Sequence, residues 1–168
     1  MAAFEYRQAL EIRDAFARHG VRYLFIGKSG ALLLGYPDTT QDADIFAERS
    51  QTNCEAILLG LRDLGFALTD GQAAEILRGK DFVQLKNGPF DLDLVFAPDG
   101  IERFEDAWQR RIVVEGFPVC HIDDIIASKA ATNRQKDRDS LPRLRSFREY
   151  WLRHRDSETG FGRTSRDT

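Results

Sequence analysis

The sequence predicts a mixed α/β protein of the α+β class, with a mixed β-sheet flanked by helices and a C-terminal helical segment. The expected elements follow the order α-β-α-β-α-β-β-β-α-β-β-α-α, which lacks the regular alternation of a doubly wound parallel sheet. Short segments in the second half alternate polar and apolar residues, as adjoining antiparallel strands do. The 168 residues, 42% of them hydrophobic, suffice for one core. We therefore expect a single domain over residues 1–155.

The N-terminal part is expected to form two helices and two strands. Apolar residues recur at helical spacing over residues 4–19, and VRYLFI (21–26) is a compact apolar strand. GKSGALLLG (27–35) reads as a short helix with a small, open first turn. After a turn that contains Pro37, DADIFAE (42–48) alternates polar and apolar residues and predicts a strand.

The middle of the chain is expected to form one helix and three strands. Residues 52–64 have a helical pattern. The dipeptide Asn87-Gly88 is typical of a hairpin turn between two strands. The three antiparallel strands are expected at 74–79 (AEILRG), 81–88 (DFVQLKNG) and 90–96 (FDLDLVF).

The next segment is expected to be helix, hairpin and helix. ERFEDAWQR (102–110) predicts a short helix, and RIVVEGFPVCHI (111–122) predicts a hairpin. A further helix is expected over residues 123–132, with Asp123 placed to cap its N-terminus.

A last helix is expected over about residues 137–153. Pro142 is compatible with this helix only in its first turn, where its missing N–H costs nothing. Residues 156–168 (DSETGFGRTSRDT) have the composition of a flexible C-terminal tail.

Composition and charge exclude several classes of protein. With 24 basic and 27 acidic residues the net charge is −3, so no overall field marks a nucleic-acid binder. The charged N-terminus is not a signal peptide, and no stretch approaches the ~20 apolar residues of a membrane span. Cys54 and Cys120 are expected to be buried thiols, which suits a reducing cytoplasm.

The Gly27-Lys28-Ser29 segment resembles the end of a P-loop but does not fit one. A P-loop requires a further glycine five residues before Gly27, and the chain has Arg22 there, inside the expected strand. Two interpretations remain. The start of the following helix could bind an anion through free backbone N–H groups, or Gly27 and Gly30 could merely permit close packing.

Paired aspartates follow this helix. Asp42 and Asp44 lie two residues apart on an expected strand, so both side chains point to the same side. Asp91 and Asp93 repeat the pattern on a second strand. Carboxylates held close together repel one another unless a cation or proton intervenes, and Mg²⁺ or Mn²⁺ suits such oxygen-rich sites. The alternative for each pair is an ordinary solvated strand end.

These residues resemble the nucleotidyltransferase superfamily, which has the polymerase-beta-like fold. Its signature is an apolar strand, a glycine pair, a short helix and Asp-x-Asp on the next strand; here the stretch reads IGKSGALLLGYPDTTQDADI. Within the superfamily the chain is most similar to the minimal bacterial AbiEii and MenT-type toxin proteins. FDLDLVFAPDG with FEDAW, and DDIIASKAATNRQKDRDSLPRL, resemble later family segments, so the likeness covers most of residues 21–145.

The resemblance implies transfer of a nucleoside monophosphate from an NTP to a hydroxyl, with release of pyrophosphate. The acceptor would be tRNA, another RNA or a protein, and a cognate antitoxin would be a partner. Asp42, Asp44 and Asp93 would be catalytic metal ligands for Mg²⁺ or Mn²⁺, with Asp91 the competing choice for the third carboxylate.

The resemblance also implies residues that bind the nucleotide. Gly27 and Ser29 would lie against the triphosphate, with Lys28 beside them, and Lys129 would contact phosphate from the late helix. Asp137 would either orient Lys129 or cap the last helix.

Two departures from the family pattern keep other functions open. Lys28 replaces the second glycine, and Asp38 stands where an arginine is common. They favour a non-catalytic nucleotide- or partner-binding module on the same fold. A kinase-like transfer of the γ-phosphate is a further alternative. The basic residues 134–155 either bind an RNA acceptor or form a solvated helix face.

Overall fold

A computed structural model describes residues 4–166, with side chains described through Arg155. The described residues form one six-stranded sheet in the order β3-β4-β2-β1-β6-β5. The strands are β1 (Tyr23–Phe25), β2 (Asp42–Ala47), β3 (Phe82–Leu85), β4 (Asp91–Val95), β5 (Ile112–Val114) and β6 (Phe117–Val119). The helices are α1 (Tyr6–Arg18), α2 (Gly27–Leu33), α3 (Gln51–Asp63), α4 (Asp70–Arg78), α5 (Phe104–Arg110), α6 (Ile122–Thr132) and α7 (Gln135–Arg166).

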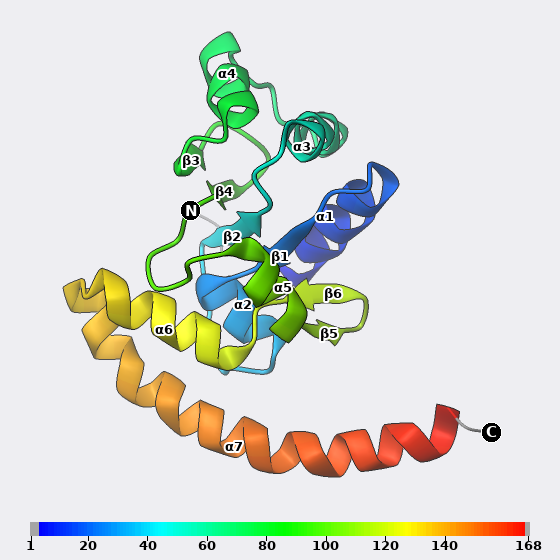
Figure 1. The fold of residues 1–168 in the computed structure, drawn as a ribbon, viewed down its shortest axis with the longest axis vertical. Coiled ribbons are helices and arrows are strands. Elements are labelled where there is room, and N and C mark those ends of the chain that lie inside the picture. Colours follow the sequence, from blue (N-terminus) through cyan, green and yellow to red (C-terminus); the bar gives the residue numbers. More distant parts are fainter. Residues whose placement is uncertain (1–3, 167–168) are drawn as a thin grey trace.

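The sheet is mixed, as the sequence predicts. Strand β1 runs antiparallel to β2 and parallel to β6, while β2 and β4 are parallel neighbours. The edge hairpins β3–β4 and β5–β6 are antiparallel. In Figure 1, α1 and α3 lie on one side of the central strands, and α6 with the long α7 lies on the other side, below the sheet. The α+β fold class is therefore confirmed.

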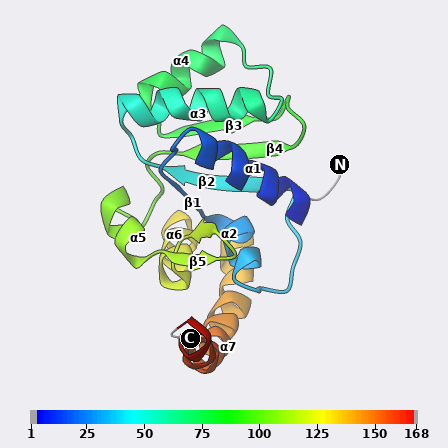
Figure 2. The ribbon, with the colours of Figure 1, turned by 90° about the vertical axis from the view of Figure 1, so that its right-hand side faces the viewer.

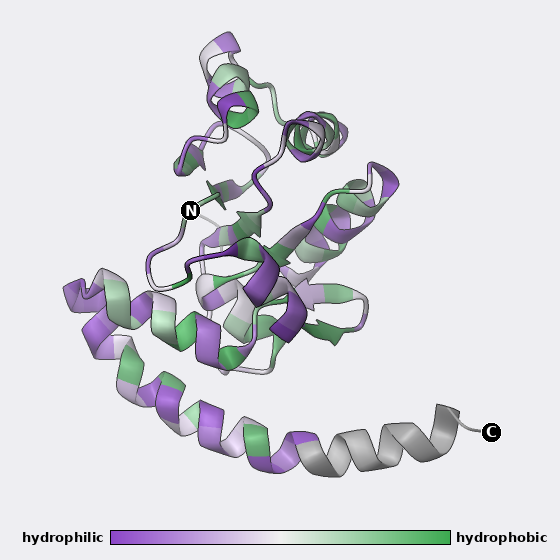
Figure 3. Cartoon of the chain, viewed as in Figure 1, coloured by the Kyte–Doolittle hydropathy of each residue, from purple (hydrophilic) through white to green (hydrophobic). Residues whose placement is uncertain are grey.

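The core lies between the sheet and these helices. On β2, Ala43 and Ile45 are fully buried, whereas Asp42 and Asp44 point to the opposite face and remain partly exposed. Figure 2 shows α1 and α3 lying beside β2, β3 and β4, and Figure 3 shows hydrophobic residues interspersed with hydrophilic ones along α1 and α6. The largest fully buried side chains include Phe16, Phe25, Phe46, Ile57, Leu61 and Phe117.

The expected strand at residues 74–79 is wrong, because this segment lies in α4. The Thr69 hydroxyl accepts a hydrogen bond from the Gln72 backbone N–H, and the Gln72 side-chain oxygen accepts one from the Thr69 backbone N–H, so the two form a capping box. Gly79 ends the helix in the left-handed conformation at φ +68°. Only Ile76 of this helix is buried, so the short apolar pattern did not distinguish helix from strand.

The start of α6 also differs from the expectation. The N-cap is His121, whose side chain accepts a hydrogen bond from the backbone N–H of Asp123 at 3.0 Å. Asp123 itself lies in the first turn, where its charge complements the helix dipole.

Helix α7 begins at Gln135, so the expectation that Pro142 lies in the first turn is wrong. A proline inside a helix leaves the carbonyl four residues earlier without its partner. That residue, Arg138, is exposed, so water can hydrogen-bond to its carbonyl. The helix extends to Arg166, through most of the segment predicted as a flexible tail; residues 167 and 168 lie outside the described part. The division into one domain and a tail stays a prediction.

Two expectations about the whole chain concern cysteines and membranes. Cys54 and Cys120 are both free and buried, which confirms the prediction of buried thiols. None of the helices in the described part of the chain is long and apolar enough to cross a membrane.

Candidate active site

The parallel pairing of β2 and β4 brings the two Asp-x-Asp pairs together. Asp42 lies opposite Asp91, and Asp44 lies opposite Asp93. Asp42, Asp44 and Asp93 line one cavity of about 640 Å³, while Asp91 is not among its lining residues. Of the two residues proposed for the third carboxylate, the structure thus places Asp93 beside the first pair.

The carboxylates of this cluster interact strongly. Burial, followed by the charge of Asp93, raises the pKa of Asp44 from 3.8 to about 8, and nearby Lys129 offsets part of this rise. Burial and the charge of Asp42 likewise raise the pKa of Asp93. The carboxylates thus disfavour one another's charged forms, because they lie close together in a partly desolvated site. Binding of a cation or a proton between these carboxylates is therefore strongly favoured.

This cluster gives a pH-dependent prediction for the metal-free protein. Because folding raises the pKa of Asp44, its protonation stabilises the fold fully below the unfolded pKa of 3.8, and this stabilisation is lost as the pH rises toward 8. In EDTA, Asp44→Asn should therefore melt at a higher temperature than the wild type, by a margin that widens between pH 4 and pH 8. Thermal denaturation at several pH values measures this. A margin that is constant with pH would contradict the raised pKa.

The first turn of α2 packs directly against Asp44. Gly27 has φ +63°, and a Cβ atom at this position would lie 2.4 Å from Asp44 Oδ2. A Cβ at Gly30 would lie 2.8 Å from the Phe25 carbonyl oxygen. Both glycines are therefore required for close packing. Gly27 also lines the cavity, so the start of α2 faces the carboxylates as well.

Ser29 anchors β2 to α2 and is not among the cavity-lining residues. Its hydroxyl donates to the Ile26 carbonyl at 3.0 Å and accepts from the Asp44 backbone N–H at 3.0 Å. The side chain is buried, at 1% exposure. The hydroxyl expected to lie against the triphosphate thus positions the backbone of Asp44 instead.

Ser29→Ala is expected to destabilise the fold by about 1–3 kcal/mol, because it leaves the buried N–H of Asp44 without an acceptor. Urea denaturation measures this loss. Ser140→Ala is a suitable control, because the Ser140 hydroxyl only donates to the Asp137 carbonyl within its own helix. Equal losses in the two variants would show that the bridge to Asp44 has no special role.

The two departures from the family pattern pair with each other. Lys28 Nζ lies 3.5 Å from Asp38 Oδ2, and Arg143 Nη1 of α7 approaches the same oxygen at 3.5 Å. The Thr39 backbone N–H donates to Asp38, and this bond together with the two cations lowers the pKa of Asp38. Lys28 also lines the cavity, so its positive charge lies at the N-terminus of α2.

Lys129 enters the cavity from α6. Its Nζ lies 3.8 Å from Asp137 Oδ1, and burial lowers its pKa, against the opposing charges of Asp137 and Asp44. Asp137 is 1% exposed and accepts hydrogen bonds from the Thr132 hydroxyl and from the backbone and side chain of Arg134. Burial alone would raise the pKa of Asp137, but these bonds lower it. Asp137 therefore both caps α7 and holds Lys129.

The cavity contains residues that sequence reasoning did not identify. Gln84 lies opposite Asp93 on the edge strand β3, and Phe82, 46% exposed, forms an apolar part of the wall. Arg134 and Lys136, which belong to the basic segment 134–155 noted in the sequence, add positive charge where α7 begins. The alternating pattern of FVQL placed Phe82 and Gln84 on one face, but their position beside Asp93 depends on the hairpin register.

The donor set fits a divalent cation of the Mg²⁺ type. Among the described side chains, no group of three or more His, Cys, Asp or Glu residues stands ready to hold an ion. Mg²⁺ needs no such cage, because it commonly takes one or two carboxylates and completes its shell with water and substrate phosphates. The mutual repulsion of Asp42, Asp44 and Asp93 would be relieved by a cation.

Comparison with known proteins identifies the fold. No protein-family model matches the chain, and no curated protein sequence matches it. Among solved structures, the chain is similar to that of the lincosamide antibiotic adenylyltransferase LnuA with lincomycin bound. The TM-score is 0.61 at 15% sequence identity, over 86% of this chain and 99% of the other. This likeness shows that the chain has a nucleotidyltransferase fold.

Proposed function

We propose that the protein is a metal-dependent nucleotidyltransferase that moves a nucleoside monophosphate from an NTP to a hydroxyl acceptor. One observation carries the proposal: Asp42, Asp44 and Asp93, on neighbouring parallel strands, line one cavity with the start of α2 and Lys129. A cavity that holds both carboxylates and a lysine suits a substrate made of a triphosphate and its divalent metal ion, because the carboxylates bind the metal and the lysine binds the phosphates.

Each side chain has a role in this reaction. Asp42 and Asp44 would hold Mg²⁺ or Mn²⁺, with Asp93 completing the set; the bound ion supplies charge neutralisation at the phosphates. Lys28, Lys129 and the N–H groups at the start of α2 would bind the triphosphate. The acceptor oxygen forms a bond to the α-phosphorus, and pyrophosphate leaves with the electrons of the broken P–O bond. The hydroxyl proton passes to the Asp93 carboxylate, which lines the same cavity.

Lys129→Met should lower kcat/KM for the NTP by about a hundredfold, since it removes a preorganised positive charge from the phosphate site. The fold should persist, because Asp137 keeps its bonds to Arg134 and Thr132. Steady-state kinetics measure the effect. Lys80→Met is the control, because Lys80 pairs with Glu75 and does not line the cavity. A similar loss in both variants would exclude a direct role for Lys129.

The proposal is tested with NTPs labelled separately at the α- and γ-phosphate. Purified protein is incubated with Mg²⁺ or Mn²⁺, each NTP, and either total RNA or a small-molecule extract. α-Label on an acceptor, together with pyrophosphate release, supports nucleotidyl transfer when both are absent from the Asp42→Asn, Asp44→Asn double variant. Transfer of the γ-label alone would instead indicate a kinase.

The ion pair between Lys28 and Asp38 favours a second candidate, the non-catalytic binding module. If Asp38 holds Lys28 away from the triphosphate, the protein would bind nucleotide without turnover. Tight NTP binding with no label transfer would support this function, and Asp38→Asn, which frees Lys28, would then be the variant to examine.

The acceptor and the biological setting belong to the same proposal. The resemblance to AbiEii and MenT-type toxins supports a tRNA or RNA acceptor and a cognate antitoxin, and the two buried thiols suit a reducing cytoplasm. The likeness to LnuA, an adenylyltransferase of a lincosamide antibiotic, supports a small-molecule hydroxyl instead. Both acceptors require the same metal and NTP chemistry.

A further inference from the structure

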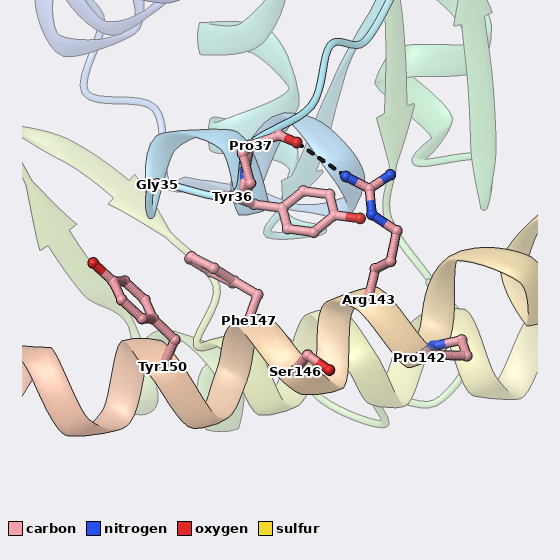
Figure 4. A pocket seen from close by; sticks show the side chains of 8 residues that line it. All are labelled: Gly35, Tyr36, Pro37, Pro142, Arg143, Ser146, Phe147 and Tyr150. Carbon is pink, nitrogen blue, oxygen red and sulfur yellow. Dashed lines mark hydrogen bonds between the residues drawn. The ribbon is translucent and has the colours of Figure 1, made fainter.

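A second cavity lies between α7 and the loop that follows α2. Its volume is about 640 Å³, in the range of small-molecule sites. Figure 4 shows the rings of Tyr36, Phe147 and Tyr150 along it, with Arg143 at one end. Tyr36 and Phe147 meet edge to face at 5.5 Å between centroids, and Tyr150 is 53% exposed. Such a surface favours a ligand with an apolar ring body.

In this cavity, which we call the aromatic pocket, one polar group has no hydrogen-bond partner among the described residues. Among the described side chains, the Tyr36 hydroxyl is the buried polar atom without a hydrogen-bond partner. Figure 4 shows it directed toward Arg143, whose guanidinium lies 5.4 Å from the Tyr36 ring centre and whose Nη2 donates to the Pro37 carbonyl at 3.1 Å. Because a buried hydroxyl without a partner is costly, a ligand that accepts a hydrogen bond from Tyr36 beside Arg143 would be favoured.

The aromatic pocket and the cavity of Asp42, Asp44 and Asp93, here called the catalytic cavity, are connected through the loop between α2 and β2. The loop contributes Tyr36 and Pro37 to the pocket and Thr40 to the catalytic cavity. Between them lies Asp38, which pairs with Lys28 on the catalytic side and with Arg143 on the pocket side. The ion pairs of Asp38 thus join a lining residue of the catalytic cavity to a lining residue of the aromatic pocket.

We propose that the aromatic pocket binds the acceptor, a small compound with an apolar ring body, a hydrogen-bond-accepting substituent for Arg143 and Tyr36, and the hydroxyl that is modified. The inference rests on the proposed function. The hydroxyl reaches past Asp38 to the α-phosphorus, where its oxygen forms the new P–O bond, pyrophosphate leaves, and the proton passes to Asp93.

The composition of the pocket favours a small compound over RNA as the acceptor. Two proline and three aromatic side chains dominate the lining, and Arg143 is the only charged residue among the described lining residues. An RNA acceptor would need several unpaired cations along its backbone path. The pocket is also too short to follow an RNA strand, since its lining comes from one loop and about two turns of α7.

Binding is tested with anilinonaphthalene sulfonate, whose naphthalene rings and sulfonate match the aromatic wall and Arg143. Ser146→Trp fills the pocket from an exposed helix position, and Tyr150→Ala removes one aromatic wall. Each should weaken binding by at least about tenfold, that is about 1.4 kcal/mol. Arg145→Trp is the matched control, because Arg145 is exposed on the same helix and does not line the pocket. Equal affinity in Ser146→Trp and the control would overturn the proposal.

Acceptor use is tested with α-labelled NTP and two fractions of one cell extract, the low-molecular-mass compounds and the RNA. We expect label in the low-mass fraction, reduced by Ser146→Trp and unaffected by Arg145→Trp. Label in RNA alone would overturn the inference while supporting nucleotidyl transfer. If wild-type protein releases no pyrophosphate from any NTP, the proposed function fails, and with it the acceptor role; dye binding that depends on Ser146 would then report a binding site without transfer.

Discussion

Asp44→Asn should reduce nucleotidyl transfer by on the order of a thousandfold or more, because it removes a metal-binding carboxylate at the centre of the cluster. Asp44 lies opposite Asp93 on the neighbouring strand, and Gly27 packs on its side chain. The positive charge of Lys129 offsets part of the rise that burial causes in the pKa of Asp44. The substitution keeps the shape of the side chain, so the fold should persist. The rate of pyrophosphate release with saturating NTP measures the effect.

Asp91→Asn is the matched control for this variant. Asp91 lies on the same face of β4 as Asp93 and pairs with Asp42 across the sheet, but it does not line the cavity. It should keep most of the activity. Equal losses at Asp44 and Asp91 would mean that general charge at this sheet edge, rather than a defined metal site, supports the reaction. A normal rate for Asp44→Asn would refute the assigned role of the carboxylate.

Local sequence pattern was sufficient to predict the centre of this site. Asp42 and Asp44 share a strand face because side chains alternate, and the short helix before them follows from GKSG and the apolar residues after it. The convergence of β2 and β4 could only be supposed, because parallel pairing joins segments almost fifty residues apart. The structure supplies it through the register that pairs Asp44 with Asp93.

Register is also the reason that Gln84 was missed. A two-residue turn at Asn87-Gly88 would place Gln84 opposite Asp91, whereas the connection uses residues 86–90 and places Gln84 opposite Asp93. Gly88 packs against the Phe66 ring, a tertiary contact that no local turn rule contains. The edge of the carboxylate cavity therefore depends on how the hairpin packs on Phe66, in the segment that follows α3.

Side-chain partners were the least predictable feature. Ser29 looked like a phosphate contact from its place in GKSG, yet its hydroxyl is used by the backbone of Ile26 and Asp44. Lys28 and Asp38 seemed to be two independent departures from the family pattern, but the turn brings them into one ion pair. The contacts of Ser29 with Asp44 and of Lys28 with Asp38 join residues ten or more positions apart, where sequence spacing gives no distance.

Gly27→Ala is expected to reduce activity by about a hundredfold, because the added methyl group must displace the Asp44 side chain. A displacement of about 1 Å at a reacting group can cost that much in rate. The new Cβ would lie 2.4 Å from Asp44 Oδ2, and φ is +63°. We expect a loss of stability of about 1–3 kcal/mol from the backbone conformation and the contact together. Urea denaturation and pyrophosphate release measure the two effects.

Gly20→Ala separates the backbone strain from the contact with the carboxylate. Gly20 has nearly the same conformation, φ +66°, but a Cβ there would meet no atom within 4 Å. It should lose stability through strain alone, about 1 kcal/mol, and keep its activity. If Gly27→Ala lost no more activity than Gly20→Ala, Asp44 would tolerate displacement, and the close packing of α2 on β2 would serve the fold rather than the chemistry. A selective loss at Gly27 would instead show that the glycine is needed because the carboxylate occupies the space where its side chain would be.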